Sequence, residues 1–125
     1  MTTKEKVKAI VDALDEKKGQ DIEVLKVEEI TTLTEYFVIC TATSTTQVKA
    51  LADNVEFRLR HDWNLEKHHA EGYGSAKWIL LDYGFAIVHI FVPEAREFYS
   101  LEKLWKDAVK IESSELEIER FGRTR

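Results

Sequence analysis

The sequence predicts an α/β or α+β fold: a mixed β-sheet of about five strands flanked by helices. Two segments carry apolar residues at helical spacing, and short runs of β-branched and aromatic residues lie between and after them. Residues 78–92, WILLDYGFAIVHIFV, contain two such runs around a turn-like centre. The resulting order is helix, strand, strand, helix, strand, hairpin and helix.

The first helix is predicted from a capping box and one apolar stripe. Thr2 and Glu5 have the capping-box spacing, and Val7, Ile10 and Leu14 recur at i, i+3 and i+7. Gly19 is expected to end this helix. Residues 21–27 predict a short strand, residues 28–35 a polar connection, and the apolar run at 36–41, YFVICT, a central strand covered on both faces.

A second helix is expected to begin near Ser44 or Thr45, whose hydroxyls can cap free amides, and to end at about Arg60. Its inward stripe is Val48, Leu51, Ala52, Val55 and Leu59. Phe57 lies off that stripe. An exit turn over residues 61–65 and a short strand over residues 67–71 should follow.

Residues 78–92 predict a β-hairpin whose turn is Asp82, Tyr83 and Gly84, because glycine adopts the positive φ that tight turns often need. Alternation gives the first arm two faces, Trp78, Leu80 and Asp82 against Ile79, Leu81 and Tyr83. If Ile79 and Leu81 face the core, a large aromatic and an aliphatic side chain point the other way. This is the first indication of a binding surface.

Pro93 is expected to end the hairpin, and residues 94–104 predict a helix. Residues 106–125 are charged, and both a weakly docked helix and an unstructured tail remain open for them. We expect one domain over residues 1–108 and a charged C-terminal tail over residues 109–125.

The composition of the chain limits the classes of function that the protein can have. No apolar run approaches the ~20 residues of a membrane span, and the N-terminus lacks a secretory signal, so we expect a cytoplasmic protein without a membrane partner. The 23 acidic and 18 basic side chains leave a net charge of −5. This charge argues against a surface that binds nucleic acid mainly by neutralising phosphates, and it suits a basic protein partner.

Motifs for metal or cofactor chemistry are weak, and we predict no metal site and no cofactor. His68 and His69 are adjacent and would point to opposite sides of a strand, which prevents both from binding one metal ion. His89 is expected to be a hydrogen-bonded core histidine, and Cys40 a small buried hydrophobe. Gly72-Tyr73-Gly74 lacks the third glycine of a phosphate loop.

Nucleotidyl transfer usually needs two acidic side chains at i and i+2 of one strand to hold Mg²⁺. Asp82 has Leu80 and Gly84 at those positions. We therefore predict that the chain is not an enzyme. A nucleotidyltransferase-like enzyme and a homodimeric scaffold remain the alternatives.

Several ordered motifs resemble the ribosomal silencing factors, also called the Iojap-like family. They are YFVICTATS, Gln47-Val48, Ala52-Asp53, Glu71-Gly72, the hairpin, and Arg96 with Tyr99, Leu101, Glu102, Leu104 and Trp105. The resemblance implies a nucleotidyltransferase-like sheet without catalytic acids. It also implies binding to ribosomal protein fourteen of the large subunit, a block to subunit joining when nutrients are scarce, and homodimers.

Carried onto this sequence, the resemblance implies a partner-binding surface that includes Trp78, with Asp82, Tyr83 and Gly84 near it. We add Leu80, which strand alternation puts on the same face as Trp78, and Phe85, which lies beside this surface in the sequence. Phe85 departs from the family, which usually has a second aspartate there. We expect no direct sequence-specific contact with nucleic acid.

Overall fold

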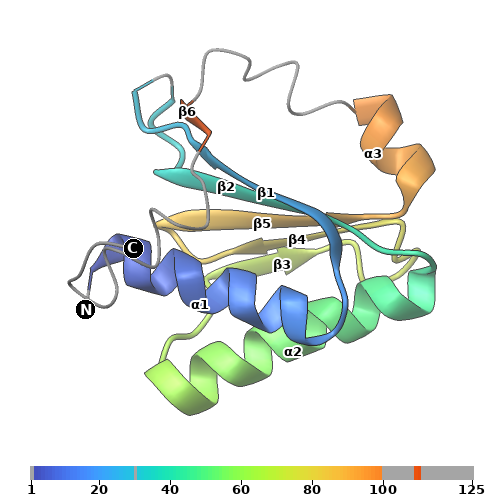
Figure 1. The fold of residues 1–125 in the computed structure, drawn as a ribbon, viewed down its shortest axis with the longest axis horizontal. Helices are drawn as coiled ribbons and strands as arrows, with labels where there is room; N and C mark the ends of the chain where they lie inside the picture. The colour runs from blue at the N-terminus through green and yellow to red at the C-terminus, as the bar shows by residue number, and fades with distance from the viewer. Residues whose placement is uncertain (1, 30, 100–108, 111–125) are drawn as a thin grey trace, which may run out of the picture.

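The computed structural model describes residues 2–29, 31–99 and 109–110. A six-stranded sheet has the order β3-β4-β5-β2-β1-β6. Its strands are β1 Gln20–Lys26, β2 Tyr36–Thr41, β3 His69–Glu71, β4 Trp78–Asp82, β5 Ala86–Phe91 and β6 Val109–Lys110. The β2–β5 pair is parallel and the other four pairs are antiparallel, which confirms the predicted mixed sheet (Figure 1).

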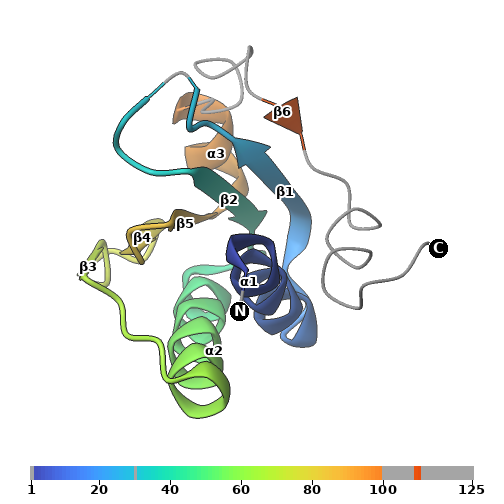
Figure 2. The ribbon, with the colours of Figure 1, turned by 90° about the vertical axis from the view of Figure 1, so that its left-hand side faces the viewer.

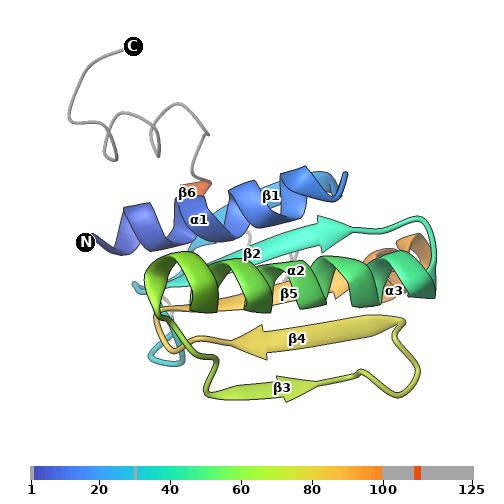
Figure 3. The same cartoon turned by 90° about the horizontal axis from the view of Figure 1, so that it is seen from below.

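In the ranges that the structure describes, three helices cover the two faces of this sheet unequally. They are α1 Thr3–Glu16, α2 Thr45–Trp63 and α3 Pro93–Tyr99. Helices α1 and α2 lie side by side on one face, and α3 lies on the other (Figure 2). Seen from the helical side, β3 forms the sheet edge beyond α2 (Figure 3). None of the helices in the described part of the chain has the length and hydropathy of a membrane span.

Two apolar cores follow from these layers. The larger lies between the sheet and α1–α2 and contains the whole predicted stripe of α2, each member fully buried. The smaller lies on the opposite face and comprises Leu25, Val27, Phe37, Ile39 and Phe91. Because β2 contributes to both cores, all six of its residues are buried, as its continuous apolar run predicts.

Helix boundaries follow local capping, with two differences from expectation. The Thr2–Glu5 capping box forms as predicted, but α1 ends at Glu16 and Lys18 adopts the left-handed conformation. Gly19 instead allows the chain to pack closely against Cys40, because a Cβ at this position would stand 2.5 Å from the Cys40 sulfur. Helix α2 starts after Ser44 and runs to Trp63, past the expected Arg60, because the left-handed Asn64 provides the stop.

Val109–Lys110, in the predicted tail, pair with Leu25 and Lys26 as a short antiparallel strand. The sheet therefore includes two residues beyond the domain boundary expected at residue 108. Local periodicity carries no signal for such a pairing. The predicted helix over 94–104 is seen from Pro93 to Tyr99, and its remainder and the rest of the tail lie outside the described residues.

Arg96 ties α3 to the ends of two strands. Its guanidinium donates to the backbone oxygen of Asp21 at 2.6 Å and to the Thr41 hydroxyl at 2.7 Å. Asp21 has a positive φ of 47° beside an irregularity in the β1–β2 register, so the irregular backbone presents its carbonyl to Arg96.

Candidate functional site

The hairpin forms as predicted and places its two faces on opposite sides of the sheet. Strands β4 and β5 pair Trp78 with Phe91, Leu80 with His89 and Asp82 with Ile87. Ile79 and Leu81 are fully buried in the core under the helices. Trp78 and Leu80 therefore lie on the face away from α1 and α2, and both are half-buried.

An open cavity of about 340 Å³ lies beside these two side chains at the β3–β4 edge. Its lining is Glu71, Gly72, Trp78 and Leu80, which we call the Trp78 patch. The patch combines an indole, an aliphatic side chain and one exposed carboxylate. Such a surface can bury an apolar group of a partner and present an acidic rim to it.

Two of the predicted surface residues lie elsewhere, which corrects the expectation of one shared surface. Tyr83 is only 4% exposed and belongs to the core under the helices, where burial raises the pKa of its hydroxyl. Phe85 packs against the same core, 6.2 Å from the Tyr83 ring, with the Lys6 ammonium 5.3 Å from its own ring centroid. Strand alternation puts Tyr83 on the face opposite Leu80, and Phe85 follows it there.

Asp82 and Gly84 build the hairpin turn. The Asp82 carboxylate accepts a hydrogen bond from the Gly84 amide at 2.8 Å, and Gly84 has φ +85°. The His68 ring covers the glycine so closely that an added Cβ would stand 2.7 Å from its Cε1 atom. Across the strands, Asp82 faces His69 and Ile87, neither of which is an acid.

His89 is the predicted hydrogen-bonded core histidine. It is 4% exposed, and its Nδ1 atom lies 3.1 Å from the indole Nε1 of Trp78. Burial lowers the pKa of His89 to about 4, so the ring is neutral at neutral pH. The other histidines are dispersed: His61 stacks on Phe57 of α2, and His69 pairs with Glu71 at 3.0 Å.

Among the described residues, no group of three His, Cys, Asp or Glu side chains is placed to hold a metal ion. Cys40 is fully buried, and burial raises the pKa of its thiol to about 12. This thiol is therefore protonated and inert, as its place in an apolar run predicts.

Glu56 on α2 holds the edge strand β3 beside the Trp78 patch. No motif in the sequence indicated this role. Its carboxylate accepts the hydroxyl hydrogen of Tyr73 and pairs with the Lys67 ammonium. Lys67 precedes β3 and Tyr73 follows it, so one carboxylate ties both ends of the edge strand to α2. Burial, followed by the bond to Glu56, raises the pKa of Tyr73.

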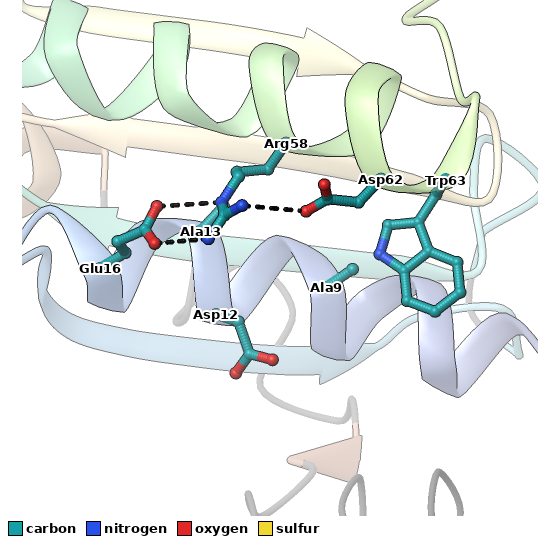
Figure 4. Close-up of a pocket in the computed structure, with 7 residues that line it drawn as sticks. All are labelled: Ala9, Asp12, Ala13, Glu16, Arg58, Asp62 and Trp63. Atoms are coloured by element: carbon teal, nitrogen blue, oxygen red, sulfur yellow. Dashed lines mark hydrogen bonds and ion pairs between the residues drawn. The ribbon is translucent and has the colours of Figure 1, made fainter.

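A second hollow of about 210 Å³ lies between α1 and α2 (Figure 4). Arg58 lies between Glu16 and Asp62 and donates to them at 2.6 Å and 3.2 Å, with Trp63 at one end of the hollow (Figure 4). The bond to Arg58 lowers the pKa of Glu16. The Arg58–Glu16 pair joins α2 to α1, and the Arg58–Asp62 pair lies within α2.

Comparisons with known proteins agree with the resemblance seen in the motifs. The model of a family described as "Ribosomal silencing factor during starvation" matches residues 1–124. A ribosomal silencing factor from Haemophilus influenzae is 42% identical over 99 residues, covering 79% of this chain and 96% of that protein. One from Halalkalibacterium halodurans is 35% identical over 112 residues, covering 90% and 95%.

A crystal structure of a Chromobacterium violaceum protein matches with a TM-score of 0.82 at 35% identity, covering 85% of this chain and 88% of that one. A mouse protein named "Mitochondrial assembly of ribosomal large subunit protein 1" is 33% identical over 98 residues, covering 77% of this chain and 43% of the mouse protein. The chain therefore belongs to the ribosomal silencing factor family, a family of ribosome-associated regulators of translation.

Proposed function

We propose that this protein binds the large ribosomal subunit through ribosomal protein fourteen and sterically blocks joining of the small subunit when nutrients are limited. Family membership supports a ribosomal partner, and the name of the mouse relative supports the large subunit. The observation that carries the proposed contact is the Trp78 patch, where Trp78 and Leu80 stay half-buried beside an open cavity.

The chemistry of the patch favours a protein partner with a basic rim. Trp78 and Leu80 supply apolar area for the centre of an interface, and Glu71 with the half-buried Asp82 supplies negative charge around it. The net charge of −5 adds long-range attraction to a basic ribosomal protein in the cytoplasm. Tyr83 and Phe85 act indirectly, by packing the hairpin against the helices.

Gradient sedimentation with separated ribosomal subunits tests the proposal. The wild-type protein should migrate with the large subunit and reduce its association with the small one. Leu80→Asp should lower the affinity for the large subunit, measured by co-sedimentation, by at least about thirtyfold. This loss corresponds to a hot-spot residue that contributes ~2 kcal/mol to binding. Phe57→Asp is the matched control, because Phe57 is 50% exposed on α2, on the opposite side of the sheet.

Two outcomes would contradict the proposal. Migration of the wild type with neither subunit would refute a ribosomal partner of this kind. Equal weakening by Leu80→Asp and Phe57→Asp would show that the Trp78 patch has no special part in binding. Cross-linking of a Glu71→Cys variant to ribosomal protein fourteen would identify the partner chain, and a cross-link to another subunit protein would overturn that assignment.

Homodimerisation, implied by the family resemblance, remains a prediction for this chain. Analytical ultracentrifugation of the wild type and the Leu80 variant tests it. A dimer that dissociates in the variant would assign the Trp78 patch to self-association in place of ribosome binding.

A further inference from the structure

We propose that His89 is a positioning residue that holds the Trp78 indole in the orientation used for docking. The inference rests on the proposed role of the Trp78 patch and extends it to a buried residue behind that surface. His89 lies directly across from Leu80 on β5, and its ring centroid is 5.7 Å from that of Trp78. The side chains of His89 and Trp78 lie on the same face of the sheet, away from α1 and α2.

The hydrogen bond between the two rings has one polarity only. An indole Nε1 is always a donor, so His89 Nδ1 accepts from Trp78 at 3.1 Å. In a neutral imidazole the proton must then be on Nε2. Trp78 thereby selects the tautomer of His89, and His89 selects the orientation of the indole.

This arrangement leaves a defect that packing alone does not explain. The Nε2 atom of His89 is buried and has no hydrogen-bond partner among the described residues. Phe37 meets the ring edge-on at 4.9 Å, and Phe91 stacks on it at 6.1 Å. A phenylalanine in this aromatic setting would bury no orphaned donor, so the histidine is best explained by the acceptor that it offers to Trp78.

A fixed indole matters because Trp78 is only half-buried. Its ring is also stacked on Phe91 at 5.0 Å, which confines one side, while the bond to His89 fixes the rotation of the ring edge. A side chain already held in its bound orientation loses less conformational freedom on docking. His89 should therefore affect affinity without touching the partner.

A pair of substitutions separates positioning from stability. His89→Asn keeps an acceptor at the place of Nδ1 but leaves a void, so it should lower the unfolding midpoint and retain binding within about twofold. His89→Phe fills the site and removes the acceptor, so it should fold at least as stably. It should nevertheless bind the large subunit about five- to tenfold more weakly, because docking must then order an indole that the free protein no longer holds in place.

The indole Nε1–H resonance of Trp78 in a ¹⁵N-labelled protein provides a readout that needs no ribosome. We expect the Nε1–H proton to stay hydrogen-bonded and to exchange slowly with solvent in the wild type and in His89→Asn. In His89→Phe the same proton should exchange faster. Trp78→Phe removes the donor, so adding His89→Phe to it should cause no further loss of binding. This double-mutant comparison also covers the case in which His89→Asn fails to fold.

An unchanged Nε1–H resonance in His89→Phe would overturn the positioning role whether or not the wild type binds ribosomes. Wild-type affinity in His89→Phe, or equal losses in both Trp78 backgrounds, would overturn it as well. Failure of the wild type to bind large subunits would instead refute the proposed function. The resonance data would still decide whether His89 orients Trp78.

Discussion

Gly72 lies directly against the backbone of Trp78: a methyl group added at Gly72 would stand 1.9 Å from the Trp78 carbonyl oxygen. Gly72 also has φ +94°, a conformation that other residues adopt only with strain. The turn after β3 can therefore approach the start of β4 only with glycine at this position. The shape of the Trp78 patch depends on this contact as much as on its side chains.

Gly72→Ala is expected to lower the free energy of unfolding by at least about 2 kcal/mol, because the clash with backbone adds to the strain of the positive φ. Chemical denaturation measures the loss. Gly74→Ala is the matched control, since nothing lies within 4 Å of its Cβ position, and its effect should stay within about 0.5 kcal/mol. Equal effects of the two variants would contradict the close approach at Gly72.

The buried His89 predicts a loss of stability on mild acidification. Its pKa falls from 6.5 to about 4 on folding because burial disfavours the charged ring. The unfolded chain therefore binds this proton more readily, and stability that is complete above pH 6.5 is lost as the pH falls towards 4. The loss should be on the order of 3 kcal/mol at most, at about 1.4 kcal/mol per pKa unit.

Urea unfolding at several pH values measures this dependence. His89→Phe has no ring to protonate, so its stability should change less over the same interval. The pKa of Glu16 is lowered by Arg58, so this carboxylate affects the free energy of unfolding only below its ordinary pKa of 4.5. The loss of stability above that pH is therefore assigned to His89. A wild-type profile as flat as that of the variant would contradict the assignment.

Asn54 closes the C-terminal end of α1 from the neighbouring helix. Its amide donates to the Ala13 carbonyl at 2.8 Å and to Glu16 at 2.9 Å, and the Ala13 carbonyl is among those that a helix end leaves unpaired. Asn54→Ala should cost about 1–3 kcal/mol of stability, measured by thermal or urea unfolding.

Asn54→Asp should cost more than Asn54→Ala at neutral pH, because a buried carboxylate would face the Ala13 oxygen and the Glu16 carboxylate. Protonation of the introduced carboxylate would restore a donor, so the gap between the two variants should narrow as the pH is lowered. Equal costs at all pH values would show that the amide donor is unimportant.

Variants of Asp82 distinguish a role of this residue in the hairpin turn from a role in catalysis. Asp82→Asn keeps an oxygen that can accept from the Gly84 amide, so the stability of the fold should remain close to wild type. Asp82→Ala removes this acceptor and should destabilise the hairpin by about 1 kcal/mol. Calorimetry with a nucleoside triphosphate and Mg²⁺ should detect no binding to the wild type, and binding that is lost in Asp82→Asn would favour the enzyme alternative.

Local sequence patterns predict most helices and strands of this protein and the face on which each side chain lies. The stripe from Val48 to Leu59 became the buried side of α2, and YFVICT became a strand buried on both faces. The hairpin alternation correctly put Trp78 and Leu80 opposite Ile79 and Leu81. These features follow from periods of 3.6 and 2 residues, which a sequence displays directly.

The folded structure, in contrast, shows which distant elements meet. It paired β2 with β5 in parallel, added β6 beside β1, and tied the ends of β3 to Glu56. It also moved Tyr83 and Phe85 out of the expected surface. It put behind Trp78 the Nε2 atom of His89, which has no hydrogen-bond partner in the described part of the chain. Such contacts join residues far apart along the chain, and periodicity specifies the face of a side chain but not the neighbour across it.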